Sequence, residues 1–183
     1  MRTPDPDRPA PRIRRADAED GAAINRVKVE TWRSAYRGLL PDALLDGLDP
    51  EDGAAFRRRG LESLSPDRVA FVADLDGAVV GFVTGGPERS GAHPGYRGEV
   101  YAIYVTARLQ GRGIGRALIR AAATELVRRG LAPILIWTLY DNPRSRAWYE
   151  AQGGIVIGEK RGLFEGYPLH EVGYGWPDPA PLL

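Results

Sequence analysis

The fold of this chain is decided by one stretch, Gly98-Glu-Val-Tyr-Ala-Ile-Tyr-Val-Thr-Ala-Arg-Leu-Gln-Gly-Arg-Gly-Ile-Gly115. Its first eight residues are apolar on both faces apart from Glu99, which predicts a central, buried strand. A glycine-rich turn follows, and apolar residues then recur at helical spacing from Gly113 to Arg129. The sequence therefore predicts a buried strand that leads through a tight turn into an amphipathic helix.

This turn predicts an anion-binding site. Glycines let backbone N–H groups approach a ligand closely, and a helix N-terminus presents unpaired donors with about half a positive charge. Phosphate is the usual anion at such a site. A dinucleotide fingerprint that began at Gly111 would need a glycine where Arg116 stands, and the P-loop lysine is missing, so NAD(P) and ATP are disfavoured. A turn without a ligand is the alternative, although Gln110 and Arg112 add polar groups around the loop.

Composition limits the chemistry that the chain can perform. Its 183 residues suit one domain, and 25 basic residues against 24 acidic ones leave a net charge of +1. That balance gives no electrostatic reason to expect nucleic acid or an anionic membrane as the main partner. The absence of cysteine excludes disulfides, thiolate metal sites and a cysteine nucleophile. The two histidines, His93 and His170, fit no metal-binding motif, so we expect no metal site.

The two ends of the chain differ in composition from the middle. Residues 1–11 are rich in proline and arginine and predict a flexible leader, residues 12–176 one domain, and residues 177–183 a C-terminal tail. No segment resembles a secretory signal peptide, and no apolar run reaches the roughly 18 residues of a membrane-spanning helix. We therefore expect a soluble, cytoplasmic protein without a membrane partner.

The domain alternates strand and helix signals. Helices are expected at residues 17–34, in two short pieces within 39–64, and at 113–129 and 143–152. Strands are expected at residues 12–15, 69–75, 78–84, 98–105, 133–139, 155–164 and 169–176. Asp17 and Asn142 are suited to cap the first and last helices, and Pro41 and Pro50 are suited to open the two short ones. This order predicts a single α/β or α+β domain with a mixed sheet.

At two places the chain resembles the GNAT superfamily of N-acetyltransferases. Residues 110–115, directly after the strand Val-Tyr-Ala-Ile-Tyr-Val, resemble its acetyl-CoA motif Gln/Arg-x-x-Gly-x-Gly/Ala. Residues 141–150 are similar to its Asn-x-x-(Ala/Ser)-x-x-(Phe/Trp)-Tyr helix. The resemblance extends from about Arg12 to Trp176. One departure is Gly153-Gly154, where the family usually has Gly-Phe.

The resemblance implies a fold and an activity. The GNAT fold is a twisted, mixed and mostly antiparallel sheet of about seven strands flanked by about four helices. The implied protein is an acetyl-CoA-dependent N-acetyltransferase that transfers the acetyl group directly to a primary amine of a small molecule or peptide. Direct transfer agrees with the absence of cysteine, because no acyl-thioenzyme is possible. The alternative is a non-catalytic acyl-CoA-binding or sensor module on the same fold.

The resemblance also implies how coenzyme A binds. Backbone N–H groups of the glycine loop would hold the pyrophosphate, and Ile103 to Val105 would pair with the pantetheine amides like an added strand. Such pairing requires the strand to separate from its neighbour near Val105. The expected coenzyme-contacting residues are Ile103, Tyr104, Val105, Gln110, Gly111, Arg112, Gly113, Ile114, Gly115, Arg116, Asn142 and Ser145.

Two residues are expected to handle protons. Glu99 is the candidate base, because alternation would place it on one face with Tyr101, Ile103 and Val105, where burial would raise its pKa. The alternative is a strand-end glutamate that points into solvent. The resemblance also allows proton removal through a water chain in place of a direct carboxylate. Tyr149 is the candidate acid: the matching family tyrosine points at the coenzyme sulfur, although a core tyrosine would show the same pattern. The Val105 N–H is the expected oxyanion donor.

The acceptor pocket of this fold is built by the segment after the first helix and by the last hairpin. Aromatic residues there could form a wall for the amine, and a carboxylate could hold a second positive group. The candidates are Trp32, Tyr36, Tyr174 and Trp176 for the aromatic wall and Glu171 for the carboxylate. The same aromatics could equally be core residues or a dimer surface, so a homodimer stays open.

Overall fold

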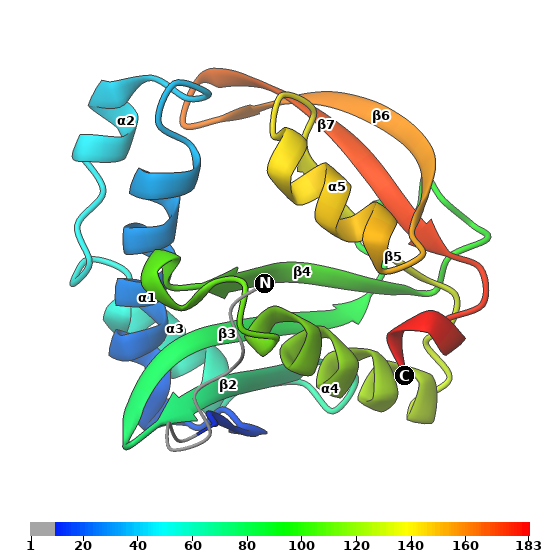
Figure 1. Cartoon of the computed structure of the whole chain (residues 1–183), viewed down its shortest axis with the longest axis horizontal. Coiled ribbons are helices and arrows are strands. Elements are labelled where there is room, and N and C mark those ends of the chain that lie inside the picture. The colour runs from blue at the N-terminus through cyan, green and yellow to red at the C-terminus, as the bar shows by residue number, and fades with distance from the viewer. Residues whose placement is uncertain (1–9) are drawn as a thin grey trace.

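The computed structural model describes residues 10–183, so that most of the expected leader, residues 1–9, lies outside the described residues. The described chain forms one seven-stranded sheet in the order β1-β2-β3-β4-β5-β7-β6 (Figure 1). Neighbouring strands are antiparallel except β4 and β5. The strands are β1 Arg12–Arg15, β2 Val69–Leu75, β3 Ala78–Pro87, β4 Gly98–Val105, β5 Ile134–Leu139, β6 Ile155–Phe164 and β7 Tyr167–Trp176. The expected mixed, mostly antiparallel sheet is confirmed.

Helices cover both faces of this sheet (Figure 1). Residues 10–183 contain five α-helices, α1 Gly21–Ala35, α2 Asp42–Asp46, α3 Ala54–Glu62, α4 Ile114–Arg128 and α5 Pro143–Ala151, where about four were expected. The side chains of α4 join a core cluster that includes Leu118 and Leu126, and those of α1 join a second cluster with Phe82 on the other face. None of the described helices is long and apolar enough to cross a membrane.

The helix starts depend on local capping. Asp17 caps a short 3-10 turn, Ala18–Asp20, and α1 begins only after it. Pro50 does not open α3: its carbonyl oxygen accepts a 2.5 Å hydrogen bond from the Asn25 side chain, which holds it in the preceding loop. Asn142 does cap α5, where its Oδ1 accepts the Ser145 N–H at 3.1 Å.

Strand β4 contains an irregularity that changes which side chains share a face. The β3–β4 register shifts between Thr84 and Gly85. Val100 and Val105 consequently lie in the same core cluster although they are an odd number of positions apart, and Ile103 packs against that cluster. Glu99, next to Val100, therefore points to the opposite face. The expected shared face of Glu99 with Ile103 and Val105 is wrong, because a bulge shifts the two-residue alternation by one.

Strands β4 and β5 separate along their length. They pair only from Gly98 to Val100, opposite Ile134 to Ile136, whereas β5 pairs with β7 along its whole length. The separation expected near Val105 is present and begins five residues earlier. It leaves one edge of β4 without a partner strand from residue 101 to residue 105.

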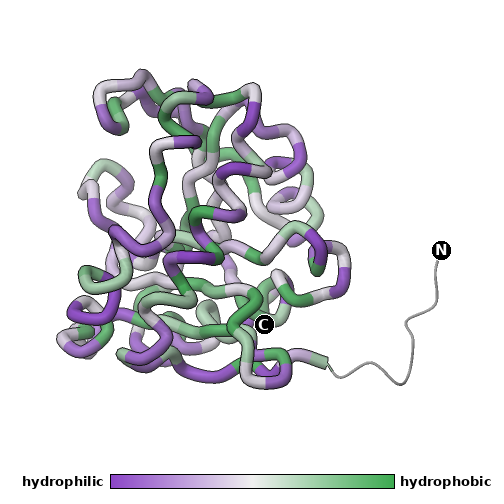
Figure 2. Tube along the Cα trace, turned by 90° about the vertical axis from the view of Figure 1, so that its left-hand side faces the viewer, coloured by the Kyte–Doolittle hydropathy of each residue, from purple (hydrophilic) through white to green (hydrophobic). Residues whose placement is uncertain are grey.

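The Gly153-Gly154 departure has a packing reason. A Cβ built at Gly154 would lie 2.9 Å from the indole of Trp176, which is fully buried. The Trp176 Nε1 donates to the Gln152 carbonyl oxygen at 2.9 Å, which fixes the ring at this place. Trp176 therefore leaves no room for an aromatic residue at position 154. Figure 2 shows hydrophilic segments at many outer turns of the trace.

Candidate active site

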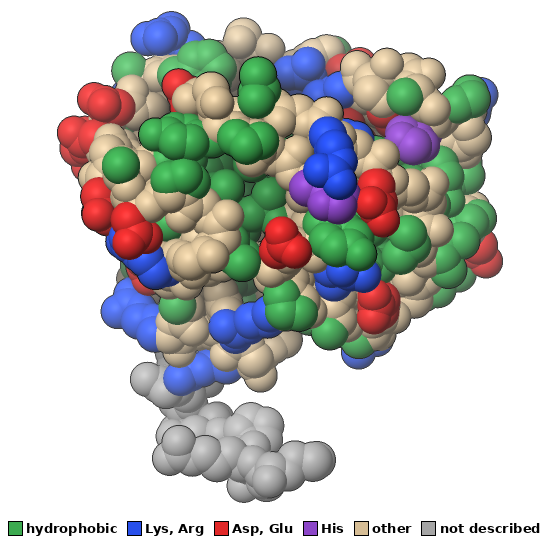
Figure 3. All heavy atoms as spheres, turned by 90° about the horizontal axis from the view of Figure 1, so that it is seen from above, with side chains coloured by type: hydrophobic (Ala, Val, Ile, Leu, Met, Phe, Trp, Pro, Cys, Tyr) green, Lys and Arg blue, Asp and Glu red, His purple; other side chains and the backbone are tan. Residues whose placement is uncertain are grey.

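A cleft of about 730 Å³ lies where β4 and β5 separate. It is bordered by the end of α1, by β4 and its following loop, and by β5 and α5. Seen from above, the surface is hollowed near its middle, and hydrophobic side chains line the hollow (Figure 3). The expected site residues that line the cleft are Tyr36, Ile103, Tyr104, Val105, Gln110, Gly111, Gly113, Ile114, Gly115, Arg116, Asn142, Ser145 and Tyr149.

The glycine loop forms one end of the cleft. Gly111 and Gly113 have φ values of +75° and +80°, in the left-handed region that favours glycine. No heavy atom lies within 4 Å of a Cβ built at either residue. The Ala117 N–H donates to the Gly113 oxygen, and the N–H groups of residues 112–116 have no backbone acceptor in the described chain. The loop thus presents free donors at a helix N-terminus, where an anion is stabilised.

The third glycine has a different role. A Cβ at Gly115 would lie 3.3 Å from the Trp148 ring, so this glycine lets α4 and α5 pack closely. Arg112 is exposed and does not line the cleft, whereas Arg116 and Arg144 do. Two cations therefore border the loop from α4 and from α5.

Gln110 ties the loop to β4. Its Nε2 donates to the Val105 carbonyl oxygen at 2.8 Å. On the other side of the strand, the Thr106 N–H donates to Val80 of β3 at 3.0 Å. Because backbone groups of successive strand residues point to opposite sides, the Val105 N–H is directed into the gap between β4 and β5.

Tyr149 lies in the middle of the cleft on α5. The residue is only 6% exposed, and burial raises the pKa of its hydroxyl above the usual value. Its ring packs against Tyr174, with ring centroids 5.6 Å apart, and against Trp176. The hydroxyl therefore stays protonated at neutral and moderately alkaline pH and can donate a proton.

Glu99 is buried beside the cleft and does not line it. It is 3% exposed, which contradicts the alternative of a solvent-facing glutamate. Its Oε1 pairs with the Arg89 guanidinium at 2.5 Å, and its Oε2 accepts the Arg89 backbone N–H at 3.1 Å. Hydrogen bonding to Glu99 raises the pKa of Arg89. The guanidinium also lies 4.2 Å from the ring centroid of Tyr101, and Tyr101 lines the cleft.

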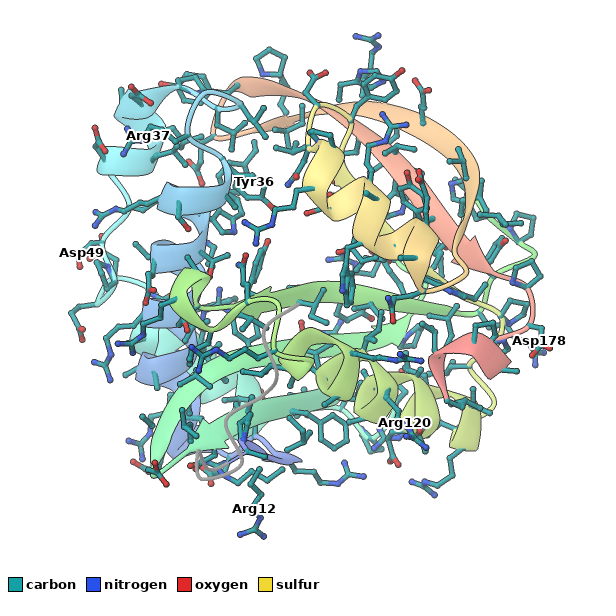
Figure 4. The ribbon with its side chains drawn as sticks, viewed as in Figure 1. Arg12, Tyr36, Arg37, Asp49, Arg120 and Asp178 are labelled. Atoms are coloured by element: carbon teal, nitrogen blue, oxygen red, sulfur yellow. The ribbon has the colours of Figure 1, made fainter. Side chains whose placement is uncertain are left out.

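Tyr36 reaches the cleft from the end of α1 (Figure 4). Its hydroxyl lies 3.5 Å from that of Tyr104, and burial raises the pKa of both groups. Trp32 does not line the cleft but packs edge-on against Tyr36, with ring centroids 5.2 Å apart. Tyr36 and Tyr104 form the part of the cleft wall next to α1, here called the tyrosine end, and Trp32 supports Tyr36 from outside the cleft.

The candidates from the last hairpin lie outside the cleft. Tyr174 is fully buried; its hydroxyl donates to Glu150 at 2.6 Å and accepts from the Arg146 Nε at 3.2 Å, so it is a core residue. Glu171 pairs with Lys160 at 3.4 Å. The Lys160 ammonium lies 4.2 Å from the centroid of the Trp137 ring, which lines the cleft. Glu171 therefore belongs to the rim.

Several further residues line the cleft. Thr31, Ser34 and Ala35 belong to residues 31–41, the segment expected to build the acceptor pocket. The residues that were not expected from the sequence are Tyr101, Ala102, Leu109, Ile136, Trp137, Thr138, Arg144, Trp148 and Gln152. The sequence could have identified Thr138 as a site residue, because it is the only polar residue in the otherwise apolar strand Ile-Leu-Ile-Trp-Thr-Leu. The others share no pattern that separates them from core or surface residues.

The described residues contain no group of three or more histidine, aspartate or glutamate side chains that could hold a metal ion. The cleft instead offers backbone donors, arginines and tyrosines. Its chemistry is therefore that of anion binding and of proton donation by a buried phenol.

Comparison with known proteins agrees with this geometry. The chain is 36% identical over 172 residues to the N-acetyltransferase YuaI of Bacillus subtilis, covering 93% of this chain and 95% of YuaI. It is 36% identical over 122 residues to the N-alpha-acetyltransferase RimI of Mycobacterium tuberculosis, covering 67% and 72% of the two chains. The structure of the PaiA N-acetyltransferase of Thermoplasma acidophilum in complex with coenzyme A superposes with a TM-score of 0.65 at 17% identity, covering 90% and 98%.

The sequence of the domain also matches a family model. The model of the acetyltransferase (GNAT) family matches residues 29–154, which include the cleft-lining segments of α1, β4, the glycine loop and α5. The match spans most of the chain, and the identity to YuaI extends over nearly the whole of both proteins. The chain thus belongs to the GNAT family and is an acetyltransferase.

Proposed function

We propose that the protein is an acetyl-CoA-dependent N-acetyltransferase that transfers the acetyl group directly to a primary amine of a small molecule or peptide. The observation that carries the proposal is the separation of β4 from β5 after Val100, which opens a cleft between the glycine loop and Tyr149. The absence of cysteine supports direct transfer and suits the reducing cytoplasm, where we propose that the protein acts.

Coenzyme A fits the residues present at the loop end of the cleft. The free N–H groups of residues 112–116 would hold its pyrophosphate, with Arg116 and Arg144 adding positive charge. The unpaired edge of β4 at Ile103 and Val105 would hold the pantetheine amides. When bound, acetyl-CoA supplies an activated acetyl group as its thioester.

Two groups of the chain would assist transfer. The Val105 N–H, which points into the gap, would stabilise negative charge that develops on the thioester carbonyl oxygen. Tyr149 would donate its proton to the departing coenzyme thiolate, and its burial supports this role because the hydroxyl stays protonated.

Removal of the acceptor proton is assigned to Glu99 acting through water. An alkylammonium has no lone pair, so it must lose a proton before it attacks. Glu99 does not line the cleft, and both of its oxygens accept hydrogen bonds from Arg89. A relay through water is therefore favoured over direct contact with the amine.

The acceptor would enter at the tyrosine end. Tyr36 and Tyr104 would contact it in the cleft, Trp32 would support Tyr36 from behind, and Glu171 would act from the rim. Tyr174 takes no part in this pocket, because both hydrogen bonds of its hydroxyl are made within the core.

Coenzyme release from acetyl-CoA tests the proposal. The purified protein is assayed with a panel of amino acids, polyamines, aminoglycosides and N-terminal peptides, and acetyl-CoA binding is followed by thermal shift. We expect binding together with saturable turnover on at least one amine class. Saturable acetyl-CoA binding without turnover on any amine would favour the sensor module instead.

A further inference from the structure

Glu99 and Arg89 form an ion pair beside the cleft, in which the carboxylate is buried. The Arg89 Nη2 and Nε donate to the two carboxylate oxygens at 2.5 Å and 3.1 Å, and the Arg89 backbone N–H donates to Oε2 at 3.1 Å. Among residues 10–183, no other lysine, arginine or histidine nitrogen lies within 4.0 Å of this carboxylate. The negative charge of Glu99 is therefore balanced by one arginine.

Glu125 on α4 shows how another buried carboxylate of this fold is held. It pairs with Arg15 at 2.8 Å, with Arg128 at 2.7 Å and with Arg129 at 2.6 Å. Hydrogen bonds from these arginines, above all from Arg128, hold the pKa of Glu125 well below its usual range although burial opposes them. Loss of one of these cations would leave two, whereas loss of Arg89 would leave Glu99 with none.

The start of the β3–β4 loop fixes Arg89 in place. The Glu88 carboxylate accepts the Ser90 N–H at 2.9 Å, which closes a turn around Arg89. The Tyr101 hydroxyl donates to the Pro87 carbonyl oxygen at 2.8 Å and so ties the loop to β4. The chain is thus bonded on both sides of Arg89, and its guanidinium is held against Glu99.

The ion pair lies where β4 leaves β5. Glu99 pairs with Leu135 of β5, and the two strands stop pairing after Val100. The next residue, Tyr101, lines the cleft, and the Arg89 guanidinium lies 4.2 Å from the centroid of its ring. Arg89 and Tyr101 therefore connect Glu99 to the cleft wall, an arrangement that suits a relay through water rather than direct contact.

Few charged or titratable groups face this ion pair. The strand residues opposite Glu99 are a glycine on β3 and a leucine on β5. Tyr101 lies against Arg89, the Arg68 guanidinium lies 5.8 Å from the same ring centroid, and Glu171 on β7 adds negative potential at Arg89. Hydrogen bonding to Glu99 raises the pKa of Arg89, so its guanidinium keeps its charge at neutral and alkaline pH.

Stability alone does not account for the pair. A buried ion pair is seldom more stable than a well-packed apolar pair of similar size, whereas loss of one partner leaves an uncompensated charge in the interior. A buried carboxyl without a cation holds its proton to higher pH, because burial disfavours the charged form. The protonation of Glu99 is thus the property that Arg89 is placed to control.

We propose that Arg89 is a positioning residue for acetyl transfer, which keeps Glu99 ionised and fixes its two oxygens so that Glu99 can receive the acceptor proton through water. The inference rests on the proposed function, in which the ammonium gives a proton to a water and that water passes a proton to Glu99. A carboxylate can receive this proton only while it is unprotonated. Without Arg89, the buried carboxyl would take up a proton from solvent instead.

The pH profile of kcat tests the inference. The wild type, Arg89→Met and Arg89→Lys are assayed from about pH 6 to about pH 9.5 with saturating acetyl-CoA and the amine that the wild type acetylates fastest. In Arg89→Met the acid side of the profile should move to higher pH by at least about one unit, which lowers kcat about tenfold there, while kcat approaches the wild-type value at the alkaline end. Arg89→Lys restores a cation without the planar fork and should recover part of the shift. A kcat lowered by the same factor at every pH overturns the inference, because a purely structural arginine would act independently of pH.

Arg68→Met is the matched control. Arg68 approaches the ring of the same Tyr101 but has no hydrogen bond to Glu99 among residues 10–183. This variant should keep the wild-type profile, and a shift equal to that of Arg89→Met would overturn the specific role of Arg89. Arg89→Gln loses the charge but keeps hydrogen-bond donors; it takes the place of Arg89→Met, with the same expected shift, if melting temperatures show that Arg89→Met is not folded.

A measurement without turnover separates this inference from the proposed function. In protein labelled with carbon-13 at the glutamate side-chain carboxyl, the NMR resonance that disappears in Glu99→Gln reports the ionisation of Glu99. Glu99 should titrate at higher pH in Arg89→Met than in the wild type, and equal titration overturns the inference. A shifted titration with an unmoved kcat profile overturns the role of Arg89 in transfer and leaves acetyl transfer intact. Absence of turnover on every amine contradicts the proposed function, and the role of Arg89 with it.

Discussion

The two ends of the cleft are built from different parts of the chain, one from backbone groups and the other from side chains. The loop end consists of backbone N–H groups from one continuous segment, with glycines that clear the space. The tyrosine end consists of side chains from β4 and from the end of α1, which are far apart in the sequence. A backbone site binds a ligand common to the whole family, whereas a side-chain site can vary with each substrate.

The largest effect is expected from a substitution that destroys the anion site at the loop end. Gly113→Glu places a side chain at a φ of +80° and a carboxylate among the free N–H groups. We expect the loss of the acetyl-CoA-induced thermal shift and a fall in affinity of more than about a hundredfold, because the carboxylate occupies the anion site and repels phosphate. Thermal shift and calorimetry with acetyl-CoA measure both.

Gly130→Glu is the matched control for this variant. Gly130 has a φ of +74° at the other end of α4, and a Cβ there meets no heavy atom within 4 Å. Its backbone strain is therefore similar, and its acetyl-CoA affinity should match the wild type. Full acetyl-CoA binding by Gly113→Glu would refute the assignment of the loop.

The next largest effect is expected at Tyr149, which lies between the two ends of the cleft. Tyr149→Phe should lower kcat by roughly 10- to 1,000-fold while acetyl-CoA affinity changes little, because the ring remains and only the proton donor is lost. Steady-state kinetics and calorimetry measure the two quantities. Tyr174→Phe, which removes a neighbouring hydroxyl bonded to Glu150, should leave kcat unchanged. An unchanged kcat in Tyr149→Phe would contradict its role as the acid.

A smaller effect is expected where Gln110 ties the loop to β4. Gln110→Ala removes the hydrogen bond to the Val105 carbonyl oxygen. One such bond contributes about 0.5–1.5 kcal/mol, so KM for acetyl-CoA should rise by up to about tenfold. Gln110→Arg keeps an N–H donor and should recover most of the affinity. Equal losses in both variants would mean that this bond does not hold the loop in place.

The loop end was predictable because its determinants are adjacent in the chain. The strand, the glycines and the following helix fall in one run from residue 98 to residue 129, and the structure brings them together in that order. The strand and helix ranges were predictable for the same reason, since periodicity and caps are local. Pro50 is the exception, because a distant residue, Asn25, holds it in a loop.

The tyrosine end was not predictable to the same degree. The face of Glu99 depends on a register shift against β3, and a single strand does not show how its partner is aligned. Tyr174 matched an aromatic wall in sequence, but Arg146 and Glu150 of α5 draw its hydroxyl into the core.

The smallest expected effect concerns the pH dependence of kcat and the Tyr149 hydroxyl, which lies between the two ends. Burial raises the pKa of Tyr149 above its usual value, so the acid stays protonated and kcat should show no alkaline decline up to about pH 10.

The pH profile of kcat at saturating acetyl-CoA and acceptor measures this effect. A hydroxyl with an ordinary tyrosine pKa would instead lower kcat about twofold by pH 10. An alkaline fall of kcat in the wild type that is absent from Tyr149→Phe would assign the titration to Tyr149 and would contradict burial as the reason why this hydroxyl stays protonated.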